Sequence, residues 1–231
     1  MKNVLNLIKY NNFLKRNNNI SSIIFGIIAL VVLIISNFID IAGYSLIYVN
    51  IPIVAIALLV NFIDSIVHFA KSFSKENARW EFLFPIKGIE YLLSKYIEFA
   101  AFQFGFATII ALISLAGNAT SLEIETVALI NYGVAVAMTS GFIVLTSVIS
   151  IVCSYFDKTA LRIIFSIIGT MIFSSISEFF EGIVNRILPY VYMSINGNIT
   201  IGIFETLVSI ALTVGIVIVA MKQIDNKLEL K

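Results

Sequence analysis

Residues 71–96 read KSFSKENARWEFLFPIKGIEYLLSKY and form the longest polar interval in a chain of 231 residues. The interval contains the only Trp, Trp80, and five of the fifteen basic residues: Lys71, Lys75, Arg79, Lys87 and Lys95. Apolar residues make up 59% of the chain and charged residues 13%, a composition typical of membrane proteins rather than soluble domains. In such a chain, one substantial charged loop indicates contact with a soluble partner.

On both sides of this loop the chain consists of apolar runs, and a helix needs about 20 residues to cross a bilayer. Six runs are candidate spans: Ile20–Ile39, Leu46–Phe69, Ile97–Ala116, Val127–Cys153, Arg162–Ser177 and Ile199–Met221. The fifth is roughly 24 Å long at a rise of about 1.5 Å per residue, so we expect it to stop before the outer surface. The sequence predicts an all-α membrane protein with six transmembrane helices in a single domain, residues 1–231.

The basic residues predict the orientation, because Lys and Arg accumulate in cytoplasmic loops. All of them except Arg186 lie in the N-terminal segment, in the loops after the second and fourth spans, or in the C-terminal tail. Both termini and the 71–96 loop are therefore expected on the cytoplasmic side. The first apolar run begins at Ile20 without a small-residue cleavage site behind it, which favours a retained span over a signal peptide.

Two segments outside the spans have helical patterns. Residues 1–19 place their apolar side chains largely on one side of a helix, which suits an amphipathic helix in the membrane interface; a frayed tail is the alternative. Residues 178–198 repeat apolar side chains at helical spacing as far as Pro189, and Tyr190 and Tyr192 follow. This pattern after a short fifth span predicts a re-entrant or surface-lying helix on the outer side.

Several kinds of chemistry lack the residues they need. The chain has no GxxxxGK[ST] motif, so we expect no nucleotide hydrolysis by the chain itself. His68 is the only histidine, which excludes HExxH metal sites because they need two. The single Cys153 is expected to be a small buried hydrophobe near a helix end. A net charge of +1 without a basic stripe argues against nucleic-acid binding. We therefore expect no catalytic residue, no bound metal and no cofactor on this chain.

The 71–96 loop has a recognisable arrangement. Phe73 and Glu76 precede a Phe84-Pro85-Ile86 turn, and the helix that follows ends in Ser94-Lys95-Tyr96. This arrangement resembles the cytoplasmic loop of ABC-2-type permeases, in which a Phe and an acidic residue precede a Leu-Pro-Ile-like turn and a helix ends in Ser/Gly-Lys-aromatic. The six spans and the inside termini are also similar to that family. Lys87-Gly88 departs from it, since a Ser or Thr helix cap often follows the Pro.

The resemblance implies a coupling helix at residues 72–84 that docks in a groove of a separate ATPase subunit. Pro85 disfavours helix at Phe84, which would separate this short helix from the third span. Aromatic anchors with a charged rim are typical of protein interfaces. The expected contact residues are Phe73, Lys75, Glu76, Arg79, Trp80, Glu81, Phe82, Phe84 and Pro85. The alternative is that the aromatic residues only lie at the lipid boundary.

Three polar residues lie within the second span. Asn61, Asp64 and His68 fall within two helical turns, and the last two are four residues apart and therefore adjacent on the helix. Ionisable groups in a bilayer cost about 2.5–3.5 kcal/mol each on insertion scales, so they usually face protein or water. The three residues could line the translocation path, or Asp64 could pair with His68 or Lys95 and hold the second and third spans together.

The fifth span carries a line of polar residues. Ser166, Thr170, Ser174 and Glu178 recur every four residues along one side of the helix. In ABC-2-type permeases the second and fifth spans resemble the walls of the central cavity, which implies that the three hydroxyl residues face the translocation path. Alternatively, the hydroxyls bond backbone carbonyls one turn back, as is common in membrane helices.

The outer side holds one basic residue and several acidic ones. Arg186 is the natural counter-ion of Glu205 near the outer end of the sixth span, and Glu178 and Glu181 compete for it. These four residues form a candidate outer gate.

Together, the resemblance implies the permease subunit of an ATP-driven ABC exporter in a bacterial plasma membrane. Its expected partners are two copies of an ATPase subunit, which bind ATP and Mg²⁺, and a second permease copy. The mostly apolar spans suit an amphipathic or antimicrobial peptide as the exported substrate. The alternatives are export of drugs or lipid-linked glycans by the same fold, or a membrane immunity or regulatory protein that does not transport.

Overall fold

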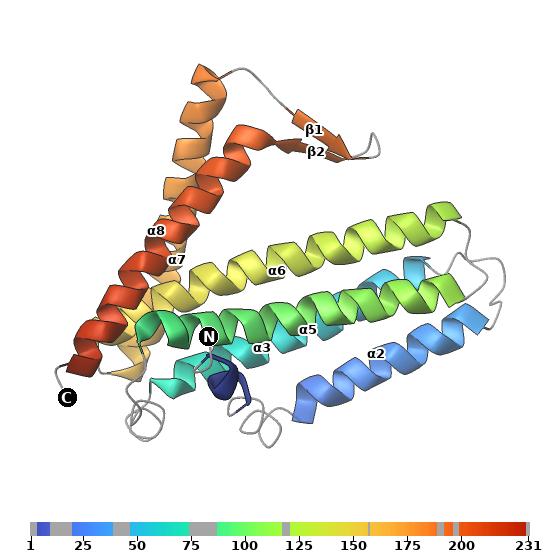
Figure 1. Cartoon of the computed structure of the whole chain (residues 1–231), viewed down its shortest axis with the longest axis horizontal. Helices are drawn as coiled ribbons and strands as arrows, with labels where there is room; N and C mark the ends of the chain where they lie inside the picture. The colour runs from blue at the N-terminus through green and yellow to red at the C-terminus, as the bar shows by residue number, and fades with distance from the viewer. Residues whose placement is uncertain are drawn as a thin grey trace. The chain divides into compact units, whose positions relative to one another are not determined.

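The computed structural model describes residues 4–9, 20–38, 47–73, 87–116, 121–156, 158–188, 192–195 and 199–229. This part of the chain is almost entirely helical (Figure 1). The long helices are α2 (Ile20–Phe38), α3 (Ile47–Ser72), α5 (Gly88–Ala116), α6 (Ser121–Tyr155), α7 (Thr159–Ile187) and α8 (Ile203–Glu229). A short helix covers residues 4–9, within the predicted interfacial segment, and two short strands precede α8.

Five segments of these helices are long and apolar enough to cross a bilayer: Pro52–Ser72, Gly88–Leu115, Ile124–Tyr155, Thr159–Ile187 and Ile203–Asn226. They confirm the predicted helical, multi-pass membrane protein. The 19-residue α2 coincides with the first predicted span and is about 28 Å long at a rise of about 1.5 Å per residue. The largest difference at a helix start is in the third span, where α5 begins at Gly88 rather than at Ile97.

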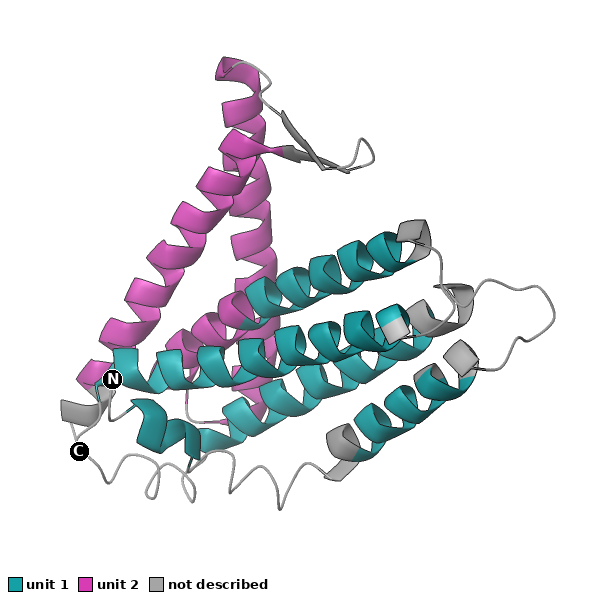
Figure 2. Cartoon of the chain, turned by 45° about the vertical axis from the view of Figure 1, so that its right-hand side comes forward, with its two compact units in different colours: residues 1–142 teal, residues 143–231 magenta. Residues whose placement is uncertain are grey.

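The chain divides into two compact units, residues 1–142 and 143–231, and the boundary lies inside α6 (Figure 2). In the first unit, α2, α3, α5 and the first part of α6 share one apolar core. Its members are Ala29, Val54, Ala57, Leu58, Phe106, Ile110 and Val127. A cluster of three aromatic rings continues this core along the helices, with Phe99 stacked on Phe142 at 4.2 Å between centroids and Phe62 edge-on to Phe99 at 6.0 Å.

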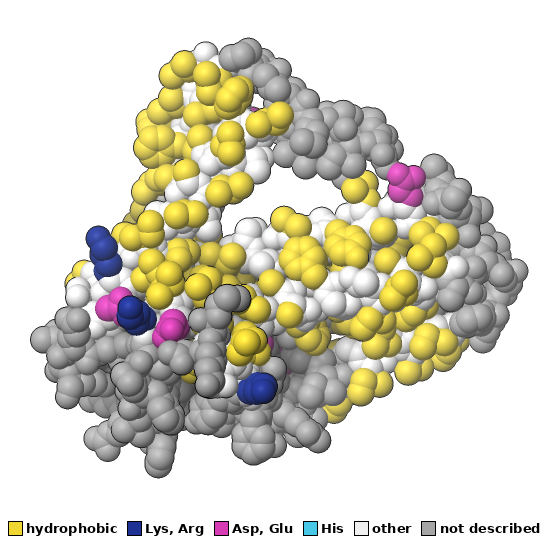
Figure 3. Space-filling model, viewed as in Figure 1, with side chains coloured by type: hydrophobic (Ala, Val, Ile, Leu, Met, Phe, Trp, Pro, Cys, Tyr) yellow, Lys and Arg dark blue, Asp and Glu magenta, His cyan; other side chains and the backbone are white. Residues whose placement is uncertain are grey.

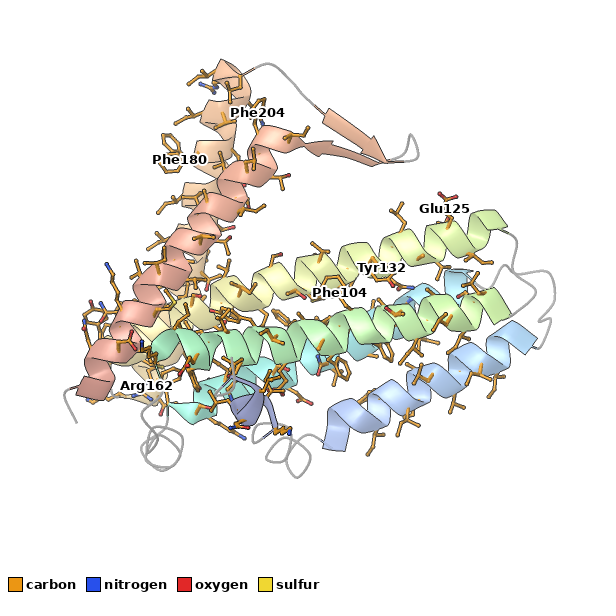
Figure 4. The ribbon with its side chains drawn as sticks, in the orientation of Figure 1. Phe104, Glu125, Tyr132, Arg162, Phe180 and Phe204 are labelled. Carbon is orange, nitrogen blue, oxygen red and sulfur yellow. The ribbon has the colours of Figure 1, made fainter. Side chains whose placement is uncertain are left out.

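α5 and α6 are also joined by an aromatic and hydroxyl contact. Phe104 and Tyr132 have ring centroids 6.4 Å apart, and the hydroxyl of Tyr132 lies 2.9 Å from Oγ1 of Thr108 (Figure 4). The first unit is therefore held by packed side chains along most of its length.

In the second unit, α7 and α8 are neighbouring helices joined by an antiparallel hairpin. Strand β1 (Tyr192–Ile195) pairs with β2 (Ile199–Gly202), with Tyr192 opposite Gly202 and Ile195 opposite Ile199. α7 ends at Ile187, just before Pro189, and the N–H of Leu188 donates to the carbonyl of Val184 at 2.9 Å. The expectation that Pro189 ends a helix is confirmed.

The fifth span and the outer segment were predicted as two elements, Arg162–Ser177 and 178–198, whereas α7 runs without a break from Thr159 to Ile187. A charged residue such as Glu178 does not interrupt a helix, and Gly182 costs only about 1 kcal/mol. The paired strands β1 and β2 lie within and just after the outer segment, and α8 begins at Ile203, four residues after the predicted start of the sixth span.

The apolar side chains of α7 are mostly exposed, and those of α8 are mostly exposed or half-buried. Met171 is 66% exposed and Phe179 is 65% exposed, and apolar residues cover much of the visible surface (Figure 3). In water this much exposed apolar surface would be unfavourable, whereas in a bilayer it is the surface that contacts lipid. The exposure therefore agrees with a membrane environment.

Candidate functional site

A buried group of side chains lies where α3 ends and α5 begins, on the two sides of residues 74–86. We call Phe69, Phe73, Tyr91 and Lys95 the loop clamp. The Phe73 ring lies 5.3 Å from the Phe69 ring and 6.1 Å from the Tyr91 ring, and Phe69 and Tyr91 are 6.0 Å apart. The ammonium of Lys95 lies 5.5 Å from the centroid of the Tyr91 ring, within the range of a cation–π contact.

The loop clamp follows from helical spacing. Phe69 lies in the last turn of α3 and Phe73 directly follows the helix, four residues later; Tyr91 and Lys95 are four residues apart at the start of α5 and therefore on one side of it. All four side chains are buried. The clamp therefore joins the end of α3 to the start of α5 where residues 74–86 connect them.

Most of the predicted coupling helix lies outside the described residues. Of residues 72–84, the structure describes Ser72, the last residue of α3, and Phe73, which is 5% exposed. The ring of Phe73 packs on this chain's own Phe69 and Tyr91. The other predicted contact residues are outside the description: Lys75, Glu76, Arg79, Trp80, Glu81, Phe82, Phe84 and Pro85.

The polar residues of the second span lie at different depths. Asn61 is 1% exposed, and no described atom forms a hydrogen bond with its Nδ2. Asp64 and His68 are half-buried, and neither lacks a partner in the protein. In this conformation Asn61 belongs to the interior of the first unit and does not line an open path.

Sequence reasoning missed a second polar residue in the same interior. Gln103 is 0% exposed, and neither its Nε2 nor its Oε1 has a hydrogen-bond partner among the described residues. It is the one amide side chain within the predicted third span, Ile97–Ala116, and this was the available signal. Lys95 was predicted as a loop charge or as a partner of Asp64, and the structure buries it in the clamp.

The polar line of α7 divides into different environments. Ser166 is buried, Thr170 is half-buried and Ser174 is exposed. Oγ1 of Thr170 donates to the carbonyl of Ser166 at 2.8 Å, so the backbone-bonding alternative describes this residue. Of the three hydroxyl residues of the line, Ser174 is the exposed one.

The predicted outer gate residues lie near the ends of two helices. Arg186 is in the last turn of α7 and Glu205 is in the first turn of α8, positions where the helix dipoles favour their charges. Oγ of Ser177 donates to Oε1 of Glu181 at 3.0 Å. Within the described part of the chain, Arg186 forms no ion pair with Glu178, Glu181 or Glu205.

At the other end of the second unit, one Arg ties two helices together. Nε of Arg162 donates to the carbonyl of Phe156 at 2.7 Å, and the Phe156 ring stacks on Phe165 with centroids 4.3 Å apart. Nε2 of Gln223, on α8, donates to the hydroxyl of Tyr155 at 2.9 Å. The thiol of Cys153 is buried near the end of α6, as predicted. Arg162 therefore links the end of α6 to the start of α7, whereas the sequence had indicated only that its positive charge helps to predict the orientation in the membrane.

Comparison of the chain with known protein families, curated proteins and solved structures found no match. Among the described residues, no group of three or more His, Cys, Asp or Glu side chains is placed to hold a metal ion. The features available for a functional argument are therefore the loop clamp, the buried amides of the first unit and the polar line of α7.

Proposed function

We propose that this chain is the permease subunit of an ATP-driven exporter and is moved by a separate ATPase through residues 72–84. The observation that carries the proposal is the loop clamp, because it connects the base of that segment to two membrane helices. A force applied to the segment would reach α3 through Phe73 and α5 through Tyr91. Rigid helices and packed side chains are the kind of elements that transmit such displacements.

As part of this proposal, we infer that the chain crosses a bacterial plasma membrane six times, with α2 as the first span and with cytoplasmic N- and C-termini. The helix at residues 4–9 would be part of an interfacial segment, and Leu5 is suitably exposed there. A second copy of the chain would complete the translocation path, and two ATPase subunits would bind ATP and Mg²⁺.

The proposed substrate is an amphipathic peptide. The apolar side chains of α7 would contact its apolar side, while Ser174 on the polar line of the same helix would hydrogen-bond to its polar groups. A strongly charged substrate would need more compensating charge than these helices provide, since charges in a bilayer are expensive.

Reconstitution tests the proposal. The full chain would be co-expressed with a Walker A-containing ATPase encoded beside it, placed in nanodiscs, and assayed for ATP hydrolysis with and without an amphipathic peptide of low net charge. We expect the two proteins to co-purify and the peptide to stimulate hydrolysis. Trp80→Ala should weaken co-purification, whereas the control Phe179→Ala, at an exposed α7 ring, should not. Peptide transport without any nucleotide-hydrolysing partner would refute the proposal, and failure to bind an ATPase would favour a regulatory or immunity protein.

A cysteine scan tests the orientation independently. Cys153 is the only cysteine and is buried, so a Cys153→Ala background removes the single competing thiol. In that background Lys75→Cys should react with a membrane-impermeant maleimide from the cytoplasmic side only. Labelling from the outside of intact cells would place the loop on the wrong side for coupling.

A further inference from the structure

Two amide side chains lie inside the first unit with unused hydrogen-bonding atoms. Nδ2 of Asn61 and both Nε2 and Oε1 of Gln103 have no partner among the described residues, and both side chains are almost completely buried. Buried polar atoms in native proteins nearly always have a partner, either protein or ordered water. Two such groups in one apolar core therefore need an explanation.

The contacts between α3 and α5 place the two amides at nearly the same level. Phe62 of α3 contacts Phe99 of α5, and the pair Phe69–Tyr91 lies further toward the loop, so the two helices are antiparallel. Asn61 lies one residue before Phe62 on α3, and Gln103 lies one turn after Phe99 on α5. Because the helices are antiparallel, both amides are displaced from the Phe62–Phe99 contact in the same direction, away from the loop. With a rise of about 1.5 Å per residue, their levels differ by about 4–5 Å.

Both amides also face the same core. Leu58 and Phe106 belong to one packed cluster. Asn61 follows Leu58 by three residues on α3, and Gln103 precedes Phe106 by three residues on α5, so each amide shares a helix side with a cluster member. Packed helices have axes about 8–10 Å apart, which leaves the two side chains within reach of a common small ligand.

The unused atoms favour a neutral ligand that both donates and accepts. They comprise two amide nitrogens, which donate, and one carbonyl oxygen, which accepts. A cation would need several oxygen ligands, and an anion would be desolvated among aromatic and aliphatic side chains. Water fits this set, because a buried water typically makes two to four hydrogen bonds to polar groups that otherwise lack partners.

We propose that Asn61 and Gln103 form an internal water-binding site that links α3 to α5. The bound water accepts from Nδ2 of Asn61 and donates to Oε1 of Gln103, and Nε2 of Gln103 donates to a water beside it. This site does not depend on the proposed export function. It assigns a structural role to Asn61 in the conformation described, in which the residue is closed off from solvent.

X-ray hydroxyl-radical footprinting of the unmodified full chain in nanodiscs tests the proposal directly, because radicals generated from an internal water oxidise the side chains next to it. Phe99 lies one turn from Gln103 and should be oxidised although it is buried. Phe69, equally buried in the loop clamp, is the matched control and should be oxidised much more slowly. Equal, slow oxidation of the two rings would overturn the proposal.

A double-mutant cycle with Asn61→Leu and Gln103→Met supplies the second measurement. Each single variant should lower the Tm, because it leaves the other amide and the water poorly satisfied, and the double variant should lose less than the sum. The double variant should also reduce Phe99 oxidation to the level of Phe69. Additive losses in Tm would refute a shared site. Coupling without oxidation of Phe99 in the native chain would indicate a direct amide–amide hydrogen bond and would likewise refute the water.

Discussion

Replacing Phe73 with Ala should loosen the junction between α3 and α5. The ring is buried against Phe69 at 5.3 Å and Tyr91 at 6.1 Å. Buried Phe→Ala substitutions cost about 3–5 kcal/mol, and each aromatic pair contributes about 0.5–1.5 kcal/mol of such a loss. Because Phe73 directly follows the last residue of α3, its surroundings can partly collapse into the space. We therefore expect Phe73→Ala to lower the free energy of unfolding by about 3 kcal/mol, which is roughly a 150-fold change in the ratio of folded to unfolded protein.

The measurement is equilibrium unfolding of the purified chain by SDS in mixed micelles, with two probes. Fluorescence of the single Trp80 reports from the loop, and reaction of the single Cys153 with a thiol dye reports from the second unit. In Phe73→Ala the Trp80 transition should move to lower SDS. If the two units unfold separately, the Cys153 transition should move less.

Phe179→Ala is the matched control, because it removes the same ring from an exposed position on α7 whose aromatic neighbour is Phe180, 5.8 Å away. Substitutions at such surface positions usually change stability by less than about 0.5 kcal/mol. If Phe73→Ala and Phe179→Ala shifted the Trp80 transition equally, the loop clamp would not be a stabilising junction. The mechanical link assumed in the proposed function would then fail with it.

Two further substitutions test contacts of the second unit. Arg162→Leu removes the 2.7 Å hydrogen bond to the carbonyl of Phe156 and should lower the free energy of unfolding by about 1.5 kcal/mol in a thermal unfolding assay. This is the lower end of the range for a charged donor, because Arg162 is only partly buried. The control Lys158→Leu, at an exposed position, should lower it by less than about 0.5 kcal/mol. Thr170→Ala should leave peptide-stimulated ATP hydrolysis nearly unchanged, because its hydroxyl bonds the backbone of its own helix, whereas Ser174→Ala should reduce it. The reverse order in this assay would contradict the assignment of Ser174 to the path.

The membrane helices could be predicted because their cause is local. A bilayer requires a long apolar run, and such runs are visible in the sequence whatever the tertiary structure. The continuity of α7 past Ser177 was harder to predict, because a charged residue such as Glu178 does not end a helix, whereas Pro189 disfavours its continuation. The paired strands were also predictable in principle, since Asn196-Gly197 between two short segments with alternating apolar residues is a strong hairpin signal.

The site could be predicted less well because its residues depend on packing between helices. An aromatic residue such as Phe73 looks the same in sequence whether it contacts a partner or its own core. Its burial follows from the position of Tyr91 on another helix. Gln103 was visible as an amide within an apolar span, but its relation to Asn61 depends on the register between α3 and α5.

The surroundings of α7 decide whether its polar line can serve a translocation path. Ser174 and Ile172 are two residues apart, so they lie at depths that differ by about 3 Å and on opposite sides of the helix. Both are exposed in the structure, Ile172 at 54%. Exposure alone does not distinguish lipid from water, but a charge does, because a Lys in lipid costs about 2.5–3.5 kcal/mol on insertion scales.

Ile172→Lys should therefore make insertion less favourable by roughly the full cost of a charge in lipid, and the amount of membrane-inserted protein should fall accordingly. Ser174→Lys should lower it much less, since water in a path would solvate the ammonium. Quantitative immunoblotting of carbonate-washed membranes would compare the two, with Ile172→Gln and Ser174→Gln as uncharged controls that separate charge from polarity. Equal losses for the two Lys variants would mean that both sides of α7 face lipid. In that case Ser174 would have no water-filled path to line, and the polar line of α7 would have to be assigned to contacts within the protein.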